Sequence, residues 1–226
     1  MRRWLTGLLL PMLLAGCASS SLVRPGYHLP PVKGLAYVSP VTTIAISRNF
    51  SPAIADKAAT LESARLLSLA LLQHRAELQL RNEVTIPDSL LLQARHEIYA
   101  AVLGIEEHWQ LASGANLPVL DYLLGQQRQR YALLTVASGL TYIPKRPPPT
   151  LAGQPRLGGS PGGRYTAAGQ PKSNIFLLIY DQQQHAIVYY RHTPPLATNE
   201  PLDGLTLQKD FAKLLKKDFP IEKERN

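Results

Sequence analysis

A six-residue apolar segment in the carboxyl-terminal third is the feature that most constrains the fold. Ile175–Tyr180 reads Ile-Phe-Leu-Leu-Ile-Tyr, with no charged side chain. A strand with one face in water alternates apolar and polar residues, whereas a strand covered on both faces is apolar throughout. The polar residues 181–185 then lead into the apolar segment Ala186–Tyr190, which predicts a hairpin. We therefore expect a sheet that is covered on both sides.

The other apolar patterns predict helices and further strands. Ala94, Ile98 and Val102 recur at four-residue spacing, as on one face of a helix. We expect one strand over 35–46, with Pro40 at an edge position or a bulge, and another at 130–143. Helices are expected at 56–80, 87–109, 118–124 and 207–220, while 82–86 fits a short strand or a turn. The predicted fold class is α+β, or α/β. It is a single compact domain with a mixed sheet of about four strands packed against about three to four helices.

Residues 144–172 have a different composition from the rest of the chain. They hold seven Pro, six Gly and no acid. The segment has too little apolar surface to offset the entropy of ordering, so we expect a long, disordered, basic loop between two strands. Its five basic residues are candidate contacts for an anionic partner: Lys145, Arg146, Arg156, Arg164 and Lys172.

The amino terminus has the layout of a bacterial export signal. Arg2 and Arg3 precede a mostly apolar stretch, Trp4–Leu14, which is too short to span a bilayer. Small residues and then Cys17, the single cysteine of the chain, follow it. We expect residues 1–16 to be a signal peptide, 17–34 a lipidated flexible tether, and 35–226 the domain.

Leu14-Ala15-Gly16-Cys17 resembles the lipobox of bacterial lipoproteins. The resemblance implies that a diacylglycerol is attached to the Cys17 sulfur, that cleavage follows Gly16, and that the new amino group is acylated. It also implies the outer membrane with a periplasmic domain, because residue 18 is Ala and not the Asp that usually signals inner-membrane retention in that family. The alternative is an ordinary signal peptide with an accidental cysteine.

The charge balance bears on the partners. The chain has 24 Lys and Arg against 16 Asp and Glu, and removing residues 1–16 takes away two Arg, so the mature chain carries 22 minus 16, or +6. Outside the cytoplasm a basic protein does not meet nucleic acid. Anionic lipid, lipopolysaccharide, peptidoglycan or an envelope protein are the expected partners, although solubility alone also accounts for the charge.

The predicted order of elements resembles small envelope lipoproteins with a domain like the TolB amino-terminal domain or the curli-secretion lipoprotein CsgG. The features that carry this resemblance are the Leu14–Cys17 motif, an early strand at Val41–Ile46 followed by helices, and a late hairpin before a terminal helix. It implies a small α/β domain at the envelope, and no functional residue is transferred from it.

Motifs for catalysis or metal binding were tested against their chemistry. Gly158–Gly162 matches the nucleophile elbow G-x-S-x-G, but Pro161 follows the serine and has no N–H to hold an oxyanion. His96 and His108 are separated by about 18 Å along one helix, so they cannot share an ion. His185 and His192 flank one strand and cannot chelate together. We predict no metal, no cofactor and no nucleotide site.

Two further groups remain as candidates. Glu106 and Glu107 with Asp121 or Asp181 are the acids that a glycan hydrolase could use. Tyr180, Tyr189 and Tyr190 fall on paired strands, where cross-strand packing is expected and an exposed binding face is the alternative.

We predict a non-enzymatic, membrane-anchored interaction or assembly module. A peptidoglycan hydrolase and a small-molecule-binding lipoprotein are the alternatives, and the oligomeric state is open.

Overall fold

The computed structural model describes residues 21–27, 34–48, 51–111, 114, 117–143, 171–193 and 199–219. They form a mixed α+β domain with four helices and an eight-stranded mixed sheet. In chain order the elements are β1 Ser21–Val23, β2 Leu35–Val38, β3 Val41–Arg48, β4 Ile54–Ala55, α1 Lys57–Gln73, β5 Leu80–Val84, α2 Asp88–His108, α3 Pro118–Gln126, β6 Tyr131–Ile143, β7 Lys172–Asp181, β8 Ala186–His192 and α4 Gly204–Asp218.

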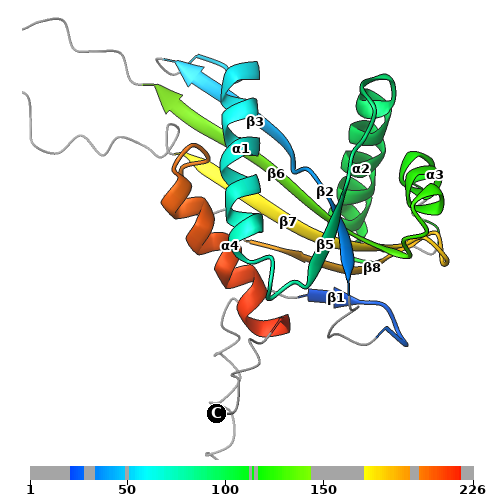
Figure 1. Ribbon diagram of the computed structural model, residues 1–226. Coiled ribbons are helices and arrows are strands. Elements are labelled where there is room, and N and C mark those ends of the chain that lie inside the picture. Colours follow the sequence, from blue (N-terminus) through cyan, green and yellow to red (C-terminus); the bar gives the residue numbers. More distant parts are fainter. Residues whose placement is uncertain are drawn as a thin grey trace, which may run out of the picture.

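The sheet lies between two layers of helices (Figure 1). Helices α1 and α4 pack on one face, where Leu71 and Phe211 join sheet residues such as Leu177. Helices α2 and α3 pack on the other face, where Ile98 and Leu120 join residues such as Leu178 and Tyr180. Successive residues of β7 thus enter opposite cores, which confirms the expectation of a strand covered on both sides.

The strand order is β1-β8-β7-β6-β2-β5, and β3 pairs with both β6 and β4. Strand β6 is parallel to β2 and β3 and antiparallel to β7. Tyr37 pairs with Leu133, yet Val41 pairs with Val136, so four steps on one strand oppose three on the other. The extra residue lies at Ser39-Pro40 and fits the predicted bulge, because Pro has no N–H to donate to a ladder.

The helices follow local signals in the sequence. Helix α1 begins after Asp56, whose carboxylate caps it by accepting from the Ala59 N–H at 2.9 Å. It ends at Gln73 rather than at residue 80. Residues 74–79 form turns, and Gln79, whose φ is +50°, leads into β5. Strand β5 runs parallel to β2 and decides the open question at 82–86 in favour of a strand. Within the described ranges, no helix combines the length and apolar character needed to cross a membrane.

The estimate of about four strands was too low. Strand β4 has two residues, β1 has three and β5 has only two buried positions, so none shows a readable apolar period. Strand β1 lies inside the segment expected to be a tether, where it pairs with β8. Lys172, expected at the end of the loop, is the first residue of β7. Residues 1–20 and 144–170 lie outside the described residues.

Candidate functional site

The predicted lipidation site and four of the five predicted contacts for an anionic partner lie outside the described residues. These are Cys17, Lys145, Arg146, Arg156 and Arg164, together with the motif at 158–162. Lys172 is described and exposed at the start of β7. Among the described elements, β1 follows the predicted anchor Cys17 most closely in the chain. The candidate site is therefore the sheet edge formed by β1 and its partner β8.

Strand β1 attaches the amino-terminal segment to the sheet. It runs antiparallel to β8, with Ser21 opposite Arg191 and Val23 opposite Tyr189. The Arg24 N–H continues the pairing by donating to the Val188 carbonyl at 2.9 Å. Cys17 precedes Ser21 by four residues, and four residues of chain reach at most about 14 Å. A lipid on Cys17 would therefore hold this edge close to the bilayer.

A buried ion pair lies beside this edge, on the α4 side. The Arg191 Nη1 donates to Asp218 Oδ2 at 2.8 Å, and the Tyr189 hydroxyl donates to the same oxygen at 2.9 Å. The Arg191 side chain is 4% exposed and Asp218 is 13% exposed. Burial is the main cause, and the Asp218 charge the next, of a pKa of Tyr189 far above its ordinary value. Asp218 is the last residue of α4, so these bonds fix the end of that helix next to β1 (Figure 1).

The same arrangement recurs at the other two tyrosines of the hairpin. The Tyr180 hydroxyl donates to Asp121 of α3 at 2.8 Å, and the Tyr190 hydroxyl donates to Glu106 of α2 at 2.5 Å. Burial first, and these hydrogen bonds second, raise the pKa of both tyrosines. All three tyrosines are fully buried, so they pack between sheet and helices and form no exposed binding face. Each ties a different helix to β7 or β8.

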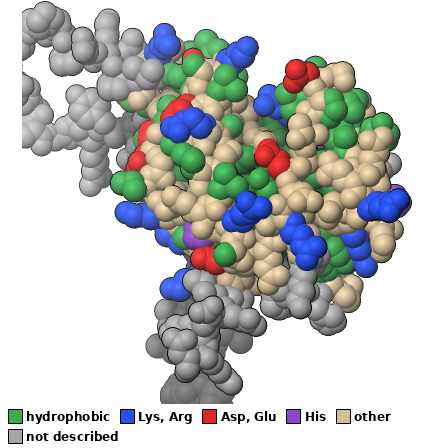
Figure 2. Space-filling model, in the orientation of Figure 1, with side chains coloured by type: hydrophobic (Ala, Val, Ile, Leu, Met, Phe, Trp, Pro, Cys, Tyr) green, Lys and Arg blue, Asp and Glu red, His purple; other side chains and the backbone are tan. Residues whose placement is uncertain are grey.

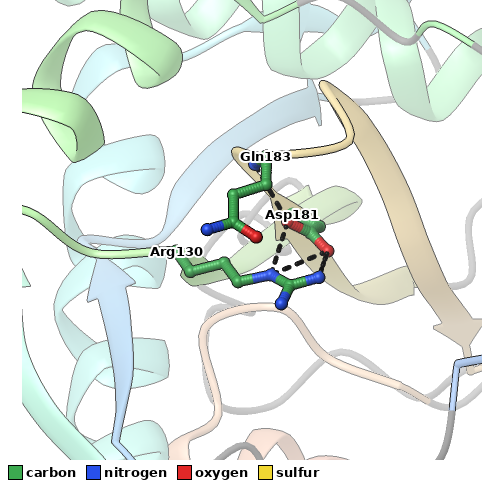
Figure 3. Close-up of polar contacts among 3 residues, drawn as sticks. All are labelled: Arg130, Asp181 and Gln183. Atoms are coloured by element: carbon green, nitrogen blue, oxygen red, sulfur yellow. Dashed lines mark hydrogen bonds and ion pairs between the residues drawn. The ribbon is translucent and has the colours of Figure 1, made fainter.

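A second ion pair holds the start of β6 to the hairpin turn. The carboxylate of Asp181 is fully buried and accepts from the Arg130 Nε at 3.1 Å and Nη2 at 2.9 Å, and from the Gln183 N–H at 3.0 Å (Figure 3). The Arg130 guanidinium also lies 4.7 Å from the centre of the Tyr131 ring. Tyr27 packs against Tyr131 with ring centres 6.1 Å apart. The segment after β1 is therefore also fixed to the domain.

Three of the four candidate acids, and the two histidines that flank β8, contact separate structural partners. Asp121 accepts from the Tyr180 hydroxyl and contacts His185 Nδ1 at 2.9 Å. Glu106 lies 3.9 Å from His192 Nδ1, at the other end of β8. Asp181 is enclosed by its bonds to Arg130 and Gln183. The part of the chain that the structure describes brings no three His, Cys, Asp or Glu together in a way that could hold a metal ion.

A shallow pocket of about 580 Å³ lies at the end of α1. Its walls include Leu72, Ala76 and Gln79 and the basic Arg75 and Arg81. The Arg75 guanidinium donates to the carbonyls of Leu80 and Arg81 at 3.3 and 2.9 Å, so it holds the turn into β5. This hollow is open to solvent, and the buried Leu80 of the apolar cluster beneath α1 and α4 forms part of its wall.

Comparison with known proteins adds little. No protein-family profile matches the chain, and no protein of curated function matches its sequence. Similar solved structures include a PelC dodecamer from Paraburkholderia phytofirmans in two crystal forms. Their TM-scores are 0.36 and 0.35 at 13% and 12% identity, and the matches cover 88% of this chain and 96% and 94% of the PelC chains. At TM-scores this low, the similarity has no bearing on the function of this chain.

Proposed function

We propose that this chain is a lipid-anchored lipoprotein of the bacterial cell envelope that acts as a non-enzymatic interaction or assembly module. The observation that carries the proposal is Leu14-Ala15-Gly16-Cys17 at the end of an apolar stretch that follows two arginines. Acylation of Cys17 on both sulfur and nitrogen gives a firm anchor, because two or more acyl chains hold where one binds only marginally. Ala18 and Ser19 after the cysteine favour the outer membrane, with the domain in the periplasm.

A binding role is supported by the polar groups of the described domain, which contact one another within the fold. Three of the four acids that could serve a hydrolase, Glu106, Asp121 and Asp181, are bound to tyrosine, histidine or arginine side chains of the fold. Such contacts hold three helices on the sheet. A domain tied to the membrane by a short chain is suited to presenting surfaces to neighbours in the envelope.

The basic loop is the proposed contact for an anionic partner. Lys145, Arg146, Arg156, Arg164 and Lys172 occur in a segment without acids. Strands β6 and β7 already pair over ten residues, from Tyr131 opposite Asp181 to Leu140 opposite Lys172, so the loop that joins them is not needed for their register. The loop can therefore be removed without disturbing the sheet.

Deletion of residues 147–170 tests this function. We expect an unchanged melting temperature and a weaker recovery of envelope partners after crosslinking in whole cells. The domain offers no control deletion of the same size. The comparison is therefore a variant that keeps the loop and has four of its basic residues replaced by Gln: Lys145, Arg146, Arg156 and Arg164. Partner recovery that is the same in all three proteins contradicts the assignment of the loop. Cleavage of peptidoglycan in a zymogram contradicts the non-enzymatic assignment.

A further inference from the structure

Helix α4 presents a row of lysines to solvent. Lys209, Lys213 and Lys216 follow one another by four and three residues, which places them on one face of the helix, and all three are exposed. The opposite face is fully buried, with Phe211 and Leu214 in the core beneath the sheet. Figure 2 shows basic side chains at the lower left flank, where α4 lies, and others spread over the rest of this face.

The acids of the same helix neutralise this row only in part. Asp218 is directed to the sheet, where it binds Arg191 and Tyr189. Asp210 is 3% exposed, and one of its oxygens accepts from Lys213, whose side chain remains 66% exposed. Asp203 caps the amino-terminal end of α4. The outward face of α4 therefore presents three lysines, of which Lys213 is paired with Asp210.

The lysine row lies close to the predicted lipid anchor. Ser21 of β1 pairs with Arg191, and Arg191 binds Asp218 at the end of α4. Lys216 is two residues before Asp218. Since Cys17 is at most about 14 Å from Ser21, acyl chains on Cys17 enter the bilayer within a few turns of this helix end. The attraction of an anionic surface extends over about a Debye length, or about 8 Å.

From this juxtaposition we infer that Lys209, Lys213 and Lys216 dock on anionic phospholipid headgroups of the membrane that holds Cys17. The inference rests on the proposed lipidation of Cys17. The lipid supplies the attachment, and the lysine face of α4 sets the orientation of the domain, with α2 and α3 turned away from the bilayer. Each lysine near an anionic surface strengthens binding by about fivefold.

The test uses the lipidated mature protein in vesicles. Because acylation consumes the thiol of Cys17, the variants Lys213→Cys and Leu92→Cys each offer a single reactive cysteine for a fluorophore. Leu92 is 82% exposed on α2 and serves as the distant site. The vesicles contain either phosphatidylcholine alone or one quarter phosphatidylglycerol, with a nitroxide on a small fraction of headgroups. We expect strong quenching at 213 in anionic vesicles, a several-fold loss of it without the anionic lipid, and weak quenching at 92 in both.

Charge reversal separates the lysine row from general basicity. Lys209→Glu with Lys216→Glu, in the Lys213→Cys background, is expected to reduce quenching several-fold. The matched control is Lys57→Glu with Arg128→Glu, two exposed bases elsewhere, which is expected to leave it unchanged. Equal quenching at 213 and 92, or equal effects of the two charge reversals, overturns the inference. Intact mass of each sample distinguishes the two proposals: a chain without acyl groups contradicts the proposed lipidation, whereas an acylated chain with no quenching at 213 contradicts only the orientation.

Discussion

Removal of the Tyr189 hydroxyl tests whether tyrosine–carboxylate bonds hold the helices on the sheet. Tyr189 is fully buried, and its hydroxyl donates to Asp218 at 2.9 Å. A hydrogen bond to a charged group stabilises a protein by about 1.5–3 kcal/mol. Asp218 keeps its bond to Arg191 in Tyr189→Phe, so we expect a loss near the lower end, about 1.5 kcal/mol. In a chain of this size that lowers the melting temperature by about 3–6 °C.

The assay is urea unfolding of the mature protein in detergent, followed by far-ultraviolet circular dichroism. Tyr122→Phe is the matched control, because the Tyr122 side chain is 57% exposed on α3 and its hydroxyl accepts only from the neighbouring Gln126 within that helix. A solvent-exposed change of this kind alters stability by at most about 0.5 kcal/mol. Equal losses in the two variants would refute the role given to the buried hydroxyl.

Three further predictions concern the same core. Burial raises the pKa of Tyr27, Tyr180, Tyr189 and Tyr190 above 10, so these residues stay protonated in the fold after they ionise in the unfolded chain. The free energy of unfolding should be constant below about pH 10 and fall above it by up to about 1.4 kcal/mol per pH unit per tyrosine. A free energy of unfolding that does not change with pH up to about pH 11 in urea titrations contradicts this. Gly139→Ala should destabilise the protein by about 1–3 kcal/mol, because a methyl group there would lie 3.0 Å from the Lys172 carbonyl oxygen. Gly104→Ala, with open space around it, should stabilise the protein by about 0.5–1 kcal/mol. A change of the same sign for both variants in chemical denaturation would contradict this prediction. Asp181→Asn should cost about 1–3 kcal/mol by weakening the bonds to Arg130, and an unchanged unfolding midpoint would argue against that pair.

The elements that the sequence predicts well are long and have a clear period. Ile175–Tyr180 is apolar at every position because both faces of β7 are covered, and this pattern is readable without any partner. The stripe of α2 and the cap at Asp56 are equally local. Strand β1 is different, because three residues have no period and they form a strand only where β8 offers an unpaired edge.

The contacts that fix the site could not be predicted for a related reason. Tyr180, Tyr189 and Tyr190 are recognisable as strand residues, but the carboxylates that accept from them come from three helices far away in the chain. Which helix end lies over which strand depends on crossings that the sequence pattern does not encode. The spacing of the α4 lysines places them on one face of a helix, and the structure adds that this helix ends next to β1.

Intact-mass analysis of the native protein extracted from membranes tests the central claim most directly. The account predicts a chain that begins at Cys17, with a diacylglycerol on the sulfur and an acyl group on the amino nitrogen. A chain that begins at Met1, or one that carries a free thiol at Cys17, would contradict it.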